Sequence, residues 1–250
     1  MKRIRRIVKR RRQKSRRQKR TGLRKRQAEE HEVCKDRLEE KAVKEKKDHY
    51  INIVLVKSLT VLGRAARLRD PYEYTHISMS FEDAPRDFVS FARRRHFAPF
   101  DAGFVHECLS DYAYGTNPEV KLKIFRVPVS KKQYSKIRAY VDYLENDPKL
   151  IFNFYGMFRP GFRVWKAYNC MSFIGRILSM AGIPMDRRFD SYNIPEMEEL
   201  LENAGLSGEE GTYSKEGPES PGYMDFVGIF ENIFLFLKLN VTLINRRMHM

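Results

Sequence analysis

Two residues far apart in the chain, Cys170 and His76, have the types and settings that thiol chemistry needs. Cys170 follows Asn169, a good helix N-cap, and begins a segment with helical periodicity. Free backbone N–H groups and the dipole at a helix N-terminus favour the thiolate, which is the nucleophilic form of cysteine. The same N–H groups can hold the oxyanion that forms when a thiolate attacks a carbonyl. A buried structural cysteine is the alternative for such a position.

His76 is the best candidate for the base that a nucleophilic cysteine requires. It begins a segment in which apolar and polar residues alternate, so we expect it on the polar face of a strand. A half-buried histidine with a purely structural role is the alternative. Three other histidines lie in the N-terminal segment or at the chain end and are weaker candidates: His31, His49 and His249.

Hydrophobic periodicity predicts the elements that position these residues. Strands are expected at 51–56, 75–81, 88–92 and 121–127. Helices are expected at 58–68, 130–147, 151–157 and 169–181. Ser130 with Gln133 forms a capping box at the start of the second helix. Residues 95–118 contain glycine and proline and are expected to be irregular.

The charge of the chain is concentrated at its N-terminus. The chain has 250 residues and a net charge of +16, and residues 1–50 hold 22 Lys and Arg against 8 Asp and Glu. We therefore expect residues 1–49 to form a basic arm, disordered or helical, ahead of a nearly neutral domain at 50–250. Residues 2–26 could contact a polyanion, either RNA or anionic lipid, and a disordered solubilising tail is the alternative.

The end of the chain has two features of its own. Residues 205–222 are rich in Gly, Ser, Glu and Pro and predict a flexible loop. A helix is expected at about 225–245, where the apolar stretch 226–244 is interrupted by polar residues. This helix either packs on the core or on a partner subunit, which would give an oligomer, or lies in a membrane interface.

Composition also excludes several classes of protein. Three cysteines cannot support a disulfide scaffold, and no His and Cys cluster has metal-ligand spacing, so no metal or other cofactor is expected. No run of about 18 uncharged apolar residues is present, which argues against a polytopic membrane protein. No apolar stretch follows the basic start, so we expect a cytoplasmic protein.

Residues 51–182 resemble the circularly permuted papain-like thiol hydrolases of the NlpC type. The resemblance rests on short stretches in which a histidine on a strand precedes a cysteine that begins a helix. These stretches are 52–55, 62–64, 71–78, 89–93, 102–105 and 168–173. His76 and Cys170 match the two roles and their order, which is the reverse of that in papain.

The resemblance implies an α+β fold in which a small mixed or antiparallel sheet packs against helices. It also implies that Cys170 is the nucleophile and His76 the base. The third polar residue of the family orients the histidine from the following strand, where this chain offers Ser90. His106 and Glu107 are alternatives further along the chain. Ser172 stands where relatives commonly have Glu or Gln, so specificity or activity could differ.

The leading hypothesis is a cysteine hydrolase or acyltransferase with the site Cys170, His76 and Ser90. Its substrate would be an amide or ester, as a small molecule, lipid or peptide, and it would act through a thioester. The first alternative is an inactive binding module on the same fold, which the basic arm directs to RNA or an anionic membrane. The second is an interaction protein that assembles through the C-terminal helix.

Overall fold

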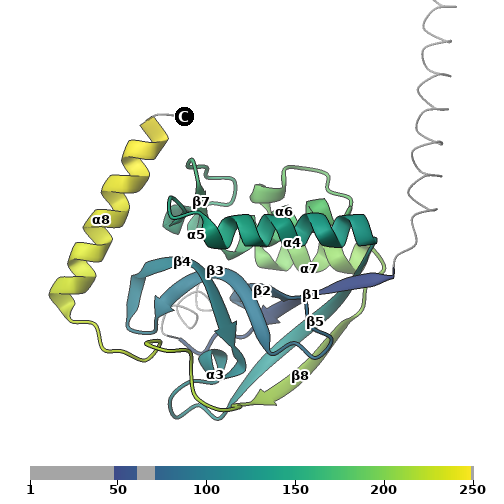
Figure 1. Cartoon of the computed structure of the whole chain (residues 1–250), viewed down its shortest axis with the longest axis horizontal. Helices are drawn as coiled ribbons and strands as arrows, with labels where there is room; N and C mark the ends of the chain where they lie inside the picture. Colours follow the sequence, from purple (N-terminus) through teal and green to yellow (C-terminus); the bar gives the residue numbers. More distant parts are fainter. Residues whose placement is uncertain (1–47, 61–70, 249–250) are drawn as a thin grey trace, which may run out of the picture. The chain divides into compact units, whose positions relative to one another are not determined.

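The computed structural model describes residues 48–60 and 71–248, which form an α+β domain (Figure 1). Residues from Lys47 onward belong to one compact unit. The predicted basic arm, apart from its last two residues, and most of the helix predicted at 58–68 lie outside the described residues.

The domain is built on an antiparallel sheet with the strand order β4-β3-β2-β1-β5-β8. The strands are β1 (His49–Val56), β2 (His76–Ser80), β3 (Asp87–Arg95), β4 (Ala98–Cys108), β5 (Glu119–Val129) and β8 (Gly208–Ser214). Residues 51–56 of β1 are all buried, because this central strand is covered on both faces. That burial explains why its sequence is a nearly continuous apolar run.

Helices cover both faces of the sheet. The larger core lies beneath α4 (Lys131–Asn146), α6 (Cys170–Met180) and α7 (Ile194–Asn203), which Figure 1 shows on one side. A smaller core on the other face includes α3 (Leu109–Tyr112). The remaining elements are β6 (Ile151–Phe152), α5 (Phe154–Phe158), β7 (Ala167–Tyr168), the 3-10 helix η1 (Phe189–Ser191) and α8 (Ile229–Met248).

The apolar stripe of α6 fixes this helix against the sheet. Phe173, Ile174 and Ile177 are fully buried, each contributing about 2 kcal/mol of hydrophobic stabilisation. On its other side α6 lies so close to η1 that a Cβ at Gly175 would meet the Phe189 carbonyl oxygen at 2.1 Å. A helix packed this tightly holds its first residue in a fixed position relative to the sheet.

Several predicted elements are confirmed. Helix α4 has the predicted capping box of Ser130 and Gln133, and α6 begins directly after its Asn169 cap. The strands predicted at 51–56, 75–81, 88–92 and 121–127 correspond to β1, β2, β3 and β5. Among the described residues, no helix is long and apolar enough to cross a membrane.

Two predictions of local structure were wrong, and a third was right in part. Residues 95–118, expected to be irregular, contain the long strand β4 and helix α3. The helix predicted at 151–157 is found as α5, but the short strand β6 takes its first two residues. The expected flexible loop at 205–222 contains β8, which pairs with β5 from Glu119↔Ser214 to Phe125↔Gly208. The sequence of β8 has low β-strand propensity, but its hydrogen bonds to β5 stabilise it as a strand.

Candidate active site

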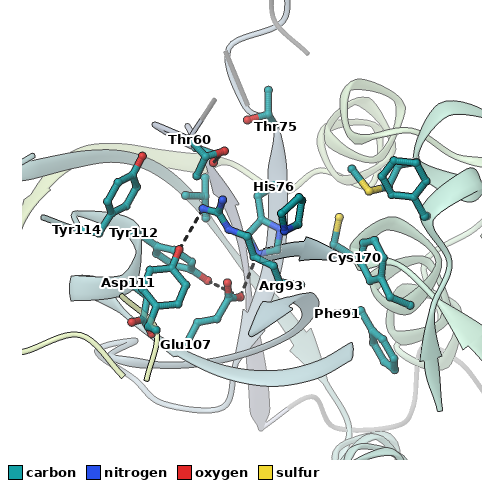
Figure 2. A pocket seen from close by; sticks show the side chains of 18 residues that line it. Thr60, Thr75, His76, Phe91, Arg93, Glu107, Asp111, Tyr112, Tyr114 and Cys170 are labelled. Carbon is teal, nitrogen blue, oxygen red and sulfur yellow. Dashed lines mark hydrogen bonds and ion pairs between the residues drawn. The ribbon is translucent and has the colours of Figure 1, made fainter. Parts of the chain in front are cut away.

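The fold brings Cys170 and His76 to the same pocket, where Figure 2 shows the cysteine sulfur facing the imidazole. Cys170 is the first residue of α6 and is 7% exposed. The Asn169 side chain accepts a hydrogen bond from the Ser172 backbone N–H at 2.8 Å, and Ser172 Oγ accepts one from the Asn169 N–H at 3.0 Å. This reciprocal cap uses the Ser172 N–H, while the N–H groups of Cys170 and Met171 precede the first possible intrahelical acceptor.

Glu107 holds His76 from the side opposite the cysteine. Its Oε2 lies 2.9 Å from His76 Nε2, and both side chains are largely buried. Because Nε2 is occupied by the carboxylate, Nδ1 is the ring nitrogen that remains for Cys170. The imidazole therefore lies between the thiol on one side and an orienting carboxylate on the other.

Glu107 is itself held by two hydroxyl groups. Ser90 Oγ donates to its Oε2 at 2.5 Å, and the Tyr112 hydroxyl lies 3.2 Å from the same oxygen. Tyr112 also hydrogen-bonds Ser78 on β2, at 2.9 Å. Ser90 thus acts on His76 through Glu107, which corrects its expected place as the residue that orients the histidine directly.

The charges of the pair stabilise each other. Burial by itself lowers the pKa of His76, but the Glu107 carboxylate and the interaction with Cys170 raise that pKa to about 10. Burial opposes ionisation of Glu107, yet the charge of His76 and the hydrogen bonds from His76, Ser90 and Tyr112 hold the carboxyl pKa below its usual value. The imidazole is therefore protonated at neutral pH.

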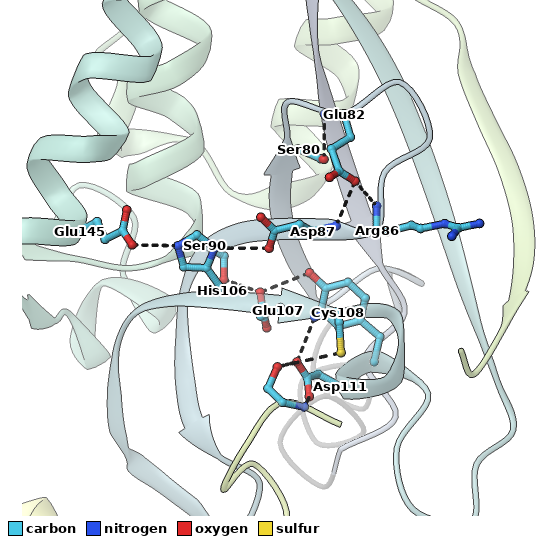
Figure 3. A network of polar contacts seen from close by, with 12 residues as sticks. Ser80, Glu82, Arg86, Asp87, Ser90, His106, Glu107, Cys108, Asp111 and Glu145 are labelled. Carbon is cyan, nitrogen blue, oxygen red and sulfur yellow. Dashed lines mark hydrogen bonds and ion pairs between the residues drawn. The ribbon is translucent and has the colours of Figure 1, made fainter. Parts of the chain in front are cut away.

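His106 does not take part in this cluster. It is the neighbour of Glu107 on β4, and successive side chains of a strand point to opposite faces. Figure 3 shows it between Asp87 and Glu145, each 3.3 Å from one ring nitrogen, on the exposed side. Only the register of β3 with β4, which pairs Phe88 with Glu107, decides which of the two residues reaches His76.

Cys170 lies between two cavities. The first, of about 130 Å³, contains His76, Glu107 and Arg93. The second, of about 360 Å³, is largely apolar and includes Tyr72, Phe158 and Ile194. A carbonyl group at the thiol could extend its acyl part to one side and its leaving group to the other.

The chain after β8 closes one side of the first cavity. Tyr223 is buried there, its hydroxyl accepts a hydrogen bond from Arg93 Nη2 at 3.1 Å, and its carbonyl accepts one from the His96 N–H at 2.6 Å. Burial and the charge of Arg93 lower the pKa of His96 to about 4, so this histidine is neutral. Among the histidines that the structure describes, His76 is the one that lines this cavity together with Cys170.

Comparison with known proteins identifies no relative: no family model, curated protein or solved structure matches this chain. In the described ranges, no group of three or more His, Cys, Asp and Glu side chains is arranged to hold a metal ion. The chemistry of the site therefore has to be inferred from its own geometry.

Proposed function

We propose that this chain is a cysteine-nucleophile hydrolase or acyltransferase of the permuted papain-like type, which acts on an amide or ester. The observation that carries the proposal is the buried pair of His76 and Glu107 beside a cysteine that begins a helix. The order of the two residues along the chain also supports the resemblance to the permuted enzymes. If Glu107 did not orient the His76 imidazole, Cys170 could be interpreted as a buried structural cysteine.

The proposed reaction has two steps. The proton of the Cys170 thiol resides on His76, and the Cys170 sulfur attacks the carbonyl carbon, while the first N–H groups of α6 stabilise the oxyanion. As the tetrahedral intermediate collapses, the bond to the leaving group breaks and His76 gives that group its proton, which leaves a thioester on Cys170. Water or another acceptor then loses a proton to His76, attacks the thioester and releases the acyl group.

The test is to trap the acyl-enzyme. With activated p-nitrophenyl esters, the wild-type chain should release a burst of p-nitrophenol and gain one acyl group on Cys170 in peptide mass mapping. Cys170→Ala should abolish both signals, and His76→Ala should slow acylation on the order of 10²-fold. Cys108→Ser is the matched control, because Cys108 is the other described free cysteine and lies outside the proposed site.

An opposite result would support the binding-module alternative. If Cys170 takes up no acyl group from any ester or thioester, and iodoacetamide alkylates it equally fast with and without His76, the enzyme proposal is wrong. Burial and the charge of Asp111 raise the pKa of Cys108, so slow alkylation at that site provides an internal reference in the same protein.

A further inference from the structure

Helix α8 is attached to the domain by only one of its faces. Leu239 and Leu243 are buried with Val164 and Ala167, and the Phe236 ring lies 4.9 Å from that of Phe100 on β4. Polar contacts also join this face to the domain. They are Glu231 with Arg95 at 2.8 Å, Asn232 with the Phe97 carbonyl at 3.1 Å, Asn240 with the Tyr155 hydroxyl, and Arg246 with the Lys149 carbonyl at 2.6 Å.

The opposite face of α8 is an apolar stripe without a partner in the described structure. Its members recur at spacings of four and three residues, which keeps them on one side of a helix. They are Phe230, Phe234, Leu237, Val241, Ile244 and Met248, and Ile233 lies beside them. Phe230 is 85% exposed and Phe234 is 63% exposed, values that are unusual for phenylalanine in water. Figure 1 shows α8 at the edge of the domain.

Cationic and amphipathic side chains border this stripe. Lys238 and Arg247 are exposed on α8 itself. On the domain side of α8, near the C-terminal end of the helix, the exposed Trp165 ring is contacted by Lys166 at 5.5 Å and by Arg246 at 5.9 Å. Tryptophan beside lysine and arginine is the combination found at the level of lipid headgroups.

We propose that the outer face of α8 binds the surface of an anionic lipid bilayer, with the helix lying in the plane of the interface. Helix α8 carries Lys238, Arg246 and Arg247 against the single acid Glu231, and this local positive charge favours an anionic surface over a second copy of the same face. Since the inner face is anchored on β4 and β7, the helix presents its stripe sideways, as interfacial helices do. This proposal is independent of the thiol chemistry.

The test is flotation of the full chain with vesicles of phosphatidylcholine, with and without about 30 mol% phosphatidylserine, at low and at high salt. High salt screens the basic N-terminal segment, so the remaining binding reports the apolar contact. Phe234→Glu and Phe234→Ala should each weaken binding to the anionic vesicles by about tenfold or more at high salt. Thr242→Glu is the matched control, because it adds the same charge to a partly exposed polar position of α8 that lies three or four residues from no member of the stripe.

Binding that the Phe234 variants reduce and Thr242→Glu leaves unchanged would establish the interface. Binding that is equal in all variants, or that vanishes at high salt, would overturn the proposal and assign the contact to the basic segment alone. Sedimentation of the same samples without lipid tests the alternative that a second copy of the chain binds the outer face of α8. A dimer that Phe234→Glu converts to monomer, with no vesicle binding, would also overturn it.

Discussion

His76 has a partner on each side, and both partners raise the pKa of its imidazole. Glu107 accepts a hydrogen bond at 2.9 Å and supplies negative charge, while Cys170 lies on the other side of the ring. The carboxylate therefore sets both the orientation and the protonation of the imidazole. Glu107 lines the first cavity but acts on the thiol through its hydrogen bond to His76, so we assign it a positioning role.

The Glu107→Gln variant tests this role. The amide can keep a hydrogen bond but not the charge, so the pKa of His76 should fall from about 10 and the alkaline limb of kcat/KM should move to lower pH. At neutral pH, kcat/KM should fall on the order of 10²-fold. The measurement is a pH profile of ester hydrolysis.

Glu145→Gln is the control for that profile. Glu145 pairs with His106 on the exposed side as Glu107 pairs with His76 in the pocket, but it is outside the site. Its substitution should leave the profile unchanged. An alkaline limb that stays in place in Glu107→Gln would show that the carboxylate does not govern His76.

At the scale of elements, helix starts were predictable and two strands were not. Asn169 and Ser130 predict the starts of α6 and α4 because a cap is decided by residues three positions apart. Strands β4 and β8 were missed because their stability comes from ladders to β3 and β5, which lie elsewhere in the sequence. Most of the candidate site was therefore predictable, but Glu107, which lies on β4, was only one of several alternatives.

The contact between α6 and η1 gives a stability prediction. Gly175→Ala should destabilise the domain by about 3 kcal/mol, because its methyl group would overlap the Phe189 carbonyl oxygen. Gly228→Ala is the matched control, since a Cβ there meets nothing within 4 Å, and its effect should stay within about 0.5 kcal/mol. Urea unfolding of both variants measures the difference. Equal stabilities would mean that α6 can move away from η1, and the position of Cys170 would then be less constrained.

At the scale of the whole molecule, the ion pair of His76 and Glu107 links stability to pH. The raised pKa of His76 gives stability that is complete below its unfolded value of 6.5 and is lost as pH rises toward about 10. The lowered pKa of Glu107 gives stability that is present above its unfolded value of 4.5 and is lost as pH falls. The two contributions coincide between pH 4.5 and 6.5.

The free energy of unfolding should therefore differ most between wild type and Glu107→Gln in this pH window, and the difference should shrink toward pH 10. Urea titrations of both proteins across the pH range measure it. A difference that does not vary with pH would show that Glu107 stabilises the fold by packing and neutral hydrogen bonds rather than by charge.

The sequence by itself determined the features that depend on near neighbours. Cys170 at a helix start, His76 on a strand and the apolar runs of β1 and α6 all follow from spacing along the chain. Tertiary structure alone decided which acidic residue meets His76, because Glu107 is 31 positions away and only strand register brings it there. It also decided which face of α8 is left exposed, since an apolar residue is buried or exposed only according to what packs against it.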